Sequence, residues 1–161
     1  MRILGIDQGI AHLGYCILED EELITYGCLT TTNKKSIQNR FYTIEDKLSD
    51  IIKEFSPEAI CCEKLFFTPP RPGQRNKSAS IVYTNMITGV IISLAGRFDL
   101  EFNMFVPGTV KKTICDNGRA TKNEVIKKIG ETYEIECPKS NKEHICDAIS
   151  IAITFSRCKG E

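Results

Sequence analysis

Four side chains that could ligate a divalent cation occur at three separate places in this sequence of 161 residues. Asp7 ends the segment RILGID, Glu63 ends the apolar segment EAICCE, and His144 and Asp147 stand three residues apart in a later apolar segment. Each alone has a structural explanation, since strand ends often carry polar turn-forming residues. An acid beside a buried strand is nevertheless costly unless it is paired or bound to metal. Because metal-dependent phosphoryl chemistry needs oxygen ligands from separate elements, the four residues together predict a metal site.

The elements that would carry these residues are visible in the apolar pattern. Short apolar segments separated by turn residues predict a three-stranded antiparallel meander over 2–7, 14–18 and 23–29. One apolar stripe then recurs at intervals of three and four residues and predicts a long helix. Its members are Ile37, Phe41, Ile44, Leu48, Ile51, Ile52 and Phe55. Ser56 precedes a proline, which disfavours the helical conformation and should end this helix.

The rest of the chain predicts alternating strands and helices. We expect strands at 58–63 and 100–106, a proline-rich loop at 64–77, and helices at 78–94, from Thr121 onward and at 143–157. Thr121 and Glu124 have the spacing of a capping box, which marks a helix start. This order predicts a single α/β domain over residues 1–161, with a five-stranded mixed sheet flanked by helices.

The formal net charge of zero is a cancellation between segments. Residues 1–63 carry 6 basic and 11 acidic side chains, whereas residues 64–98 carry five basic side chains and no acid. A second basic tract at 104–130 has a net charge of +4. Charge runs are usually solvated surface, but a 35-residue window without an acid favours an anionic ligand.

The eight cysteines predict free thiols in a reducing compartment, because no pair has the C-x-x-C spacing typical of zinc sites. A structural metal held by Cys137, His144 and Cys146 is a weaker alternative. No apolar run reaches the roughly 18 residues that span a bilayer. The N-terminal segment also lacks the long apolar core of a signal peptide. We therefore expect a cytoplasmic protein with no membrane partner.

Three motifs in order resemble the RuvC family of Holliday-junction resolvases over essentially the whole chain. They are GIDQG at 5–9 with GY at 14–15, Glu63 followed by KLF, and HICDAISIAI at 144–153. The first motif also occurs in sugar kinases and actin-like ATPases. Actin-like ATPases need far longer chains with two such lobes, and this length excludes them.

The resemblance implies an RNase H-like fold and a Mg²⁺-dependent, structure-selective endonuclease of DNA recombination and repair. Such an enzyme resolves four-way junctions by paired symmetric nicks. Two Mg²⁺ ions per active site are expected, with Mn²⁺ as a substitute. The family's catalytic acids map onto Asp7, Glu63 and Asp147, and the remaining ligand position maps onto His144, where many members have Asp. Glu143 is the alternative for the role of His144, because it shares a helix face with Asp147.

The resemblance also assigns candidate DNA contacts. Phe66, with Phe67 beside it, maps onto the aromatic that contacts the opened junction, and Lys111 and Lys122 map onto phosphate-contacting lysines. The remaining candidates are cations of the two basic tracts: Lys64, Arg71, Arg75, Lys77, Lys112 and Arg119. Gln8 stands where the family usually has proline, which we expect to loosen the turn after Asp7.

The expected partners are four-way junction DNA and a second copy of the chain. A homodimer would supply the two matched sites that a nearly two-fold symmetric junction needs. The apolar helix at 78–94 is a candidate interface, although a core helix would have the same composition. A branch-migration motor complex is a further candidate partner.

Two other functions stay open on the sequence alone. One is an RNase H-fold nuclease that acts on other branched DNA or on RNA–DNA hybrids. The other is a non-catalytic junction-binding protein, against which the intact acids argue. A small-molecule phosphotransferase is disfavoured because the chain has no glycine-rich phosphate loop.

Overall fold

The computed structural model describes residues 1–64 and 78–159, with side chains up to 64 and from 81 onward. It contains a five-stranded mixed sheet with the strand order β3-β2-β1-β4-β5. The strands are β1 (Arg2–Asp7), β2 (His12–Glu19), β3 (Glu22–Thr30), β4 (Ala59–Glu63) and β5 (Glu101–Phe105). β1, β2 and β3 are antiparallel neighbours, whereas β4 runs parallel to both β1 and β5. The predicted meander and five-stranded mixed sheet are therefore confirmed.

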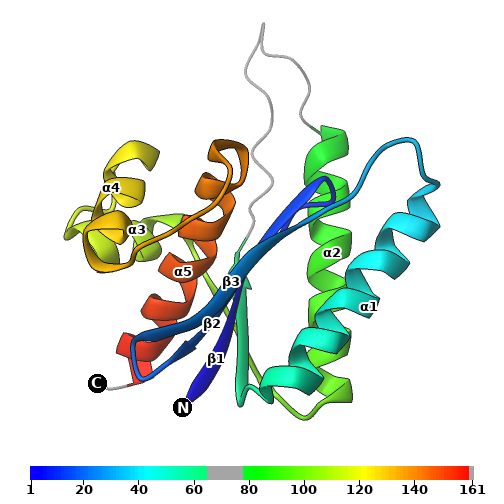
Figure 1. Ribbon diagram of the computed structural model, residues 1–161, viewed down its shortest axis with the longest axis horizontal. Helices are drawn as coiled ribbons and strands as arrows, with labels where there is room; N and C mark the ends of the chain where they lie inside the picture. Colours follow the sequence, from blue (N-terminus) through cyan, green and yellow to red (C-terminus); the bar gives the residue numbers. More distant parts are fainter. Residues whose placement is uncertain (65–77, 160–161) are drawn as a thin grey trace, which may run out of the picture.

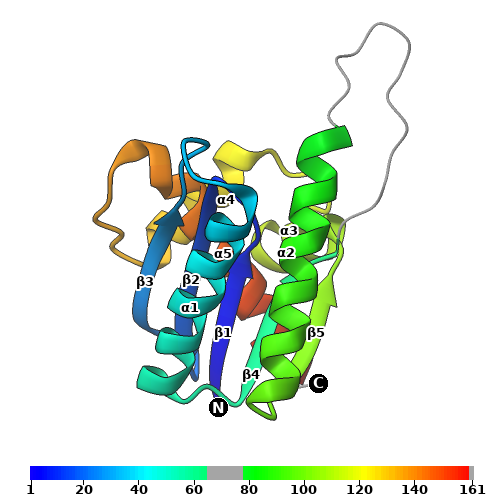
Figure 2. The ribbon, with the colours of Figure 1, turned by 90° about the vertical axis from the view of Figure 1, so that its right-hand side faces the viewer.

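Helices cover both faces of the sheet. Figure 1 shows α1 (Ile37–Phe55) and α2 (Ser78–Arg97) on one side. On the other side lie α3 (Pro107–Cys115), α4 (Lys122–Thr132) and α5 (Lys139–Lys159). The view in Figure 2 looks onto the first face, where α1 and α2 lie side by side. The chain thus forms three layers with the sheet in the middle.

Each face of the sheet has its own apolar core. Leu4, Ile6 and Ile17 belong to the core under α1 and α2, and Ile3 and Cys16 belong to the core under α5. Neighbouring strand residues point to opposite faces, so the adjacent Cys61 and Cys62 fall into different cores, as expected. All eight cysteines are free thiols.

Local signals account for most helix boundaries. Ser36 accepts a hydrogen bond from the Asn39 N–H and caps α1, which ends at Ser56 in the left-handed conformation. The capping box of Thr121 and Glu124 is present at the start of α4. α5 begins at Lys139 and α2 continues to Arg97, so both are longer than expected.

The sequence reading missed α3. This helix has nine residues and buries only Val110 and Ile114. No side chain caps its start, where Val106 is extended and Pro107 opens the first turn. With one turn of apolar spacing and no capping residue, the segment carries little helix signal of its own.

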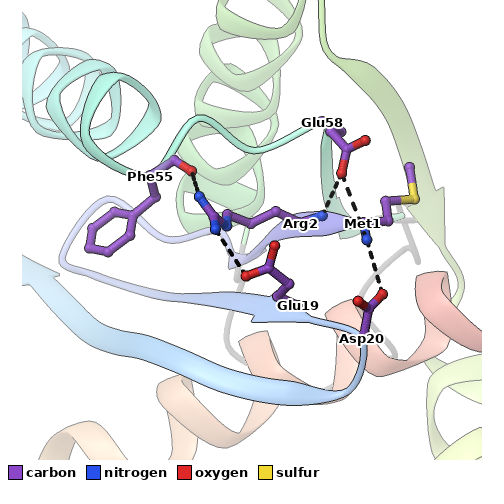
Figure 3. Close-up of polar contacts among 6 residues, drawn as sticks. All are labelled: Met1, Arg2, Glu19, Asp20, Phe55 and Glu58. Atoms are coloured by element: carbon purple, nitrogen blue, oxygen red, sulfur yellow. Dashed lines mark hydrogen bonds and ion pairs between the residues drawn. The ribbon is translucent and has the colours of Figure 1, made fainter.

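An ionic network fixes the start of β1, at the opposite end of the strand from Asp7 (Figure 3). The Arg2 guanidinium donates to the Phe55 carbonyl at 2.6 Å and to Glu19 at 2.9 Å. The Arg2 backbone N–H donates to Glu58 at 2.7 Å. These contacts join β1 to the end of α1, to β2 and to the start of β4. The position of β1 between its two neighbours is therefore set from its first residue.

Within residues 1–64 and 78–159, no helix has both the length and the apolar composition to cross a membrane.

Candidate active site

A cleft of about 460 Å³ lies at the carboxyl ends of β1 and β4, where it is bordered by α3, α4 and α5. Its lining includes all four candidate metal ligands and two of the candidate DNA-binding lysines: Asp7, Glu63, His144, Asp147, Lys111 and Lys122. The remaining lining residues come from the turn after β1, from α2 and from the apolar sides of α3, α4 and α5. The structure thus brings together residues that are up to 140 positions apart in the chain.

Parallel strand register places Asp7 and Glu63 side by side. The β1–β4 ladder runs from Ile3 opposite Ala59 to Ile6 opposite Cys62. Asp7 and Glu63 are the next residue of each strand. Because the strands are parallel, both carboxylates emerge at the same edge of the sheet.

Two glycines let α5 pack directly on β1, which carries Asp7, and on its neighbour β2. A Cβ atom on Gly14 would lie 2.1 Å from the His144 carbonyl oxygen, and one on Gly5 would lie 2.5 Å from that of Ala148. Gly14 is also the register partner of Asp7 on β2. The close approach explains Gly5 and Gly14 of the first motif, because any side chain there would push His144 and Asp147 away from Asp7.

His144 contacts Asp7 directly. Its Nδ1 lies 2.7 Å from Asp7 Oδ2, and both side chains are largely buried. The hydrogen bond to Asp7 raises the pKa of His144, although burial opposes the shift. Glu143 turns instead toward Lys122, with which it forms an ion pair. Of the two alternatives for the fourth position, His144 is the one that reaches Asp7.

Lys122 contacts the acids from the start of α4. Its ammonium pairs with Glu143 and lies 3.9 Å from Asp147 Oδ2. Burial lowers the pKa of Lys122, but Glu143, Asp147 and Asp7 outweigh it, so the net shift is upward. Lys122 therefore stays charged and neutralises part of the acidic cluster.

Burial and mutual repulsion disfavour the charged forms of two carboxyl groups in the cleft. Burial, and then the charge of Asp7, raise the pKa of Asp147 to about 7. Burial and Asp7 also raise the pKa of Glu63, and Lys122 and Lys111 only partly oppose this. Repulsion between acids that cannot all be solvated is the electrostatic condition that a bound cation relieves.

The donor set fits a hard divalent cation. Asp7, Glu63 and Asp147 offer carboxylate oxygens, and His144 adds an imidazole nitrogen, which suits Mg²⁺ or Mn²⁺ rather than a thiophilic metal. Across the described residues, no three His, Cys, Asp or Glu side chains already stand in a metal-binding group. This applies equally to the weaker alternative of Cys137, His144 and Cys146. At the cleft, the contacts of His144 with Asp7 and of Lys122 with Asp147 engage ligand atoms that a cation would take over.

The sequence reading missed His12. Its ring stacks on that of His144, with centroids 5.4 Å apart and planes inclined by 11°. His12 Nδ1 is buried and has no hydrogen-bond partner in the described part of the chain. The only signal was its identity as the other histidine of the chain, five residues after Asp7.

Gln8 behaves differently from the expectation of a looser turn. Its side chain is 6% exposed and forms hydrogen bonds with both backbone groups of Glu63. The expectation considered only the missing proline ring. The hydrogen bonds of Gln8 with Glu63 on β4 restrict the turn in place of a proline ring.

The structure describes some of the candidate DNA-binding residues and not others. Lys111 and Lys122 line the cleft, whereas Lys112 and Arg119 are exposed and lie outside its lining. Lys64 is exposed directly after Glu63. The others lie outside the described residues: Phe66, Phe67, Arg71, Arg75 and Lys77.

The meander followed by parallel strands, with acids converging at the strand ends, defines an RNase H-like nuclease fold. Comparison with known proteins gives the family. The chain belongs to the RuvC family, since the model described as "Crossover junction endodeoxyribonuclease RuvC" matches residues 3–155.

Curated relatives bear the name crossover junction endodeoxyribonuclease RuvC, and two of them serve as examples. The protein from Finegoldia magna is 33% identical, over 95% of this chain and 91% of its own length. The protein from Prochlorococcus marinus strain NATL1A is 31% identical, over 96% of this chain and 97% of its own length.

Solved structures support the fold. Thermus thermophilus RuvC matches with a TM-score of 0.77 at 24% identity, over 99% of this chain and 97% of that one. The same protein in complex with a Holliday junction substrate matches with a TM-score of 0.82 at 22% identity, covering 99% and 96%. The yeast mitochondrial Holliday junction resolvase Ydc2 matches with a TM-score of 0.67 at 18% identity, covering 99% and 79%.

Proposed function

We propose that this chain is a divalent-metal-dependent endonuclease that resolves four-way DNA junctions by paired symmetric nicks. The observation that carries the proposal is the convergence of Asp7, Glu63 and Asp147 on one cleft with Lys111 and Lys122. Membership of the RuvC family supplies the substrate class.

The acids have separate roles in this proposal. Asp7 is the central ligand, since it lies between Glu63 on the next strand and His144 on α5. Glu63 and Asp147 would each ligate one of the two metal ions. His144 would either act as a nitrogen ligand or orient Asp7 and the attacking water. Two bound Mg²⁺ ions, or Mn²⁺ in their place, would stabilise the negative charge that develops on the attacking and leaving oxygens of the phosphodiester.

The lysines of the cleft would hold the scissile phosphate. Lys111 projects from α3 and Lys122 from the first turn of α4, and both line the cleft. Both lower the pKa of Glu63 through their charge, so both act within the same electrostatic field as the acids. They would offset the repulsion between the DNA backbone and the carboxylates as the strand enters.

The proposal includes a homodimer that uses the outer face of α2. Val82, Met86 and Ile92 are large apolar side chains that remain about half exposed on this helix. Gly89 lies among them, and a Cβ atom there would meet none of the described residues within 4 Å. A mid-helix glycine costs about 0.5–1 kcal/mol relative to alanine. The packing of the single chain does not require a glycine at position 89. The close approach of a second copy would account for it.

Cleavage of a panel of substrates tests this function. A four-way junction, a replication fork, linear duplex DNA and an RNA–DNA hybrid are each incubated with the protein and Mg²⁺ or Mn²⁺. We expect symmetric nicks in the junction and much slower cutting of the other three. Preferential cutting of the fork or the hybrid would identify a different nuclease of the same fold. Binding of the junction without cutting under any metal condition would identify a non-catalytic binding protein.

A further inference from the structure

The β1–β4 ladder ends just before Asp7 and Glu63. Backbone pairing of the two strands stops at Ile6 and Cys62. On its other side β4 continues for one more step, since the Lys64 N–H donates to the Phe105 carbonyl at 2.8 Å. The N–H and C=O of Glu63 therefore point toward β1, at the place where the β1–β4 ladder ends.

The side-chain amide of Gln8 occupies that place. Gln8 Nε2 donates to the Glu63 carbonyl at 2.6 Å, and the Glu63 N–H donates to Gln8 Oε1 at 3.1 Å. A carboxamide carries the same donor and acceptor as a peptide group, so it can extend the ladder by one step. A proline at position 8 has neither group.

The amide has only one stable orientation. Gln8 is buried, and its nitrogen also lies 3.4 Å from Thr88 Oγ1 on α2. The Thr88 hydroxyl donates in turn to the Thr84 carbonyl at 3.1 Å. A flipped amide would set its nitrogen against the Glu63 N–H and its oxygen against the carbonyl. Because unpaired buried polar groups are costly, the amide holds Glu63 in a fixed position.

We infer that Gln8 is a positioning residue, which holds the backbone of Glu63 beside Asp7 so that the two carboxylates can share a cation. Asp7 and Glu63 repel each other when no cation is present, and the clamp resists their separation. This inference rests on the proposed function only in taking Glu63 as a metal ligand. It goes beyond that function by assigning a role to a residue that is neither a candidate metal ligand nor a candidate DNA contact.

The test compares Gln8→Met with Gln38→Met. Methionine keeps the length of glutamine without its hydrogen bonds, and Gln38 is exposed on α1 and does not line the cleft. Mn²⁺ binding is titrated without DNA, by electron paramagnetic resonance of the free ion. We expect the dissociation constant to rise about tenfold in Gln8→Met, as is typical when a group that orients a ligand is lost, and to be unchanged in Gln38→Met.

Cleavage separates positioning from general stability. We expect Gln8→Met to need more metal for half-maximal junction cutting and to regain its rate at saturating metal. A lower rate that no metal concentration restores, or an unchanged metal midpoint, would overturn the inference. Because Mn²⁺ binding is measured without substrate, failure of all junction cutting by the wild type would refute the proposed function and leave this test intact.

Hydrogen exchange gives a result that does not depend on the variant folding. In the wild type, we expect the Glu63 amide to be protected from exchange to a degree similar to that of Cys62. Exchange at the rate of an exposed amide would show that the clamp is absent in solution, and would overturn the inference.

Discussion

At neutral and alkaline pH, Asp147 should lower the free energy of unfolding of the metal-free protein. Its replacement by asparagine should therefore be stabilising. Burial of Asp147 on α5, and then the charges of Asp7, Glu143 and Glu63, raise its pKa from 3.8 to about 7. Asn keeps the shape of the side chain and removes the charge. Asp147→Asn should therefore relieve repulsion above pH 7 while removing a candidate metal ligand.

The size of the effect follows from the shift. A change of about three pH units corresponds to an upper limit of about 4 kcal/mol, at about 1.36 kcal/mol per unit. The side chain of Asp147 is 30% exposed and lies 3.9 Å from Lys122, whose charge favours the ionised form. We therefore expect a gain of about 1–2 kcal/mol at pH 8, which raises the melting temperature by about 2–8 °C in a protein of this size.

The pH dependence distinguishes this mechanism from a general packing effect. Between about pH 4 and pH 7 the folded protein keeps a proton on Asp147 that the unfolded chain releases. The free energy of unfolding contributed by this group therefore falls as pH rises through that window. His144 acts in the same direction, because its raised pKa stabilises the fold at low pH and the benefit is lost as pH rises. Since His144 is present in both proteins, the difference between them reports mainly on Asp147.

Thermal unfolding in the presence of EDTA, from pH 5 to pH 8.5, measures the difference. Asp50→Asn is the matched control, because Asp50 is an exposed acid that forms a surface pair with Lys47. It should change stability by no more than about 0.5 kcal/mol at any pH. The reasoning is refuted if Asp147→Asn is less stable than the wild type at pH 8, or if both lose the same stability between pH 5 and pH 8.5.

Three further predictions follow from the site and from α2. Lys111→Ala should weaken junction binding whatever the DNA sequence and should reduce the slope of log affinity against log salt by about one. In titrations at several salt concentrations, Lys53→Ala on α1 should change neither quantity. Divalent cation binding should tighten between pH 6 and pH 8 because Asp147 must lose its proton, and calorimetry that finds no pH dependence would contradict the assignment of Asp147. Gly89→Arg should dissociate a homodimer in analytical ultracentrifugation, whereas Gly130→Arg, at an equally open glycine of α4, should leave it intact. A dimer that survives Gly89→Arg must use another face.

The sequence was sufficient to predict the positions of the acids, because each one ends or interrupts an apolar segment. Strands that end in Asp7 and Glu63 must bring these side chains to one edge if they are parallel neighbours, and the structure confirms that they are. His144 and Asp147 were recognisable from their spacing on an apolar helix. The family resemblance assigned Lys111 and Lys122, which lie in the second basic tract and line the same cleft.

What the sequence could not predict depends on contacts between distant residues. The hydrogen bonds of Gln8 with Glu63 join positions 55 apart, and no local pattern announces them. The stacking of His12 on His144 likewise requires α5 to lie against β2, which the small size of Gly14 permits. α3 was missed for a different reason, since a short helix without a cap has almost no signature outside its tertiary setting.

The central claim is that Asp7 organises a metal centre that cuts DNA, and one comparison tests it most directly. Wild type and Asp7→Asn are each given a labelled four-way junction, first with Ca²⁺ to measure binding and then with Mg²⁺ to measure cutting. The wild type should produce paired symmetric nicks, whereas Asp7→Asn should bind the junction with similar affinity and cut it at least about a thousandfold more slowly, since a central group of the catalytic centre is lost. Cutting by Asp7→Asn at close to the wild-type rate would contradict the account.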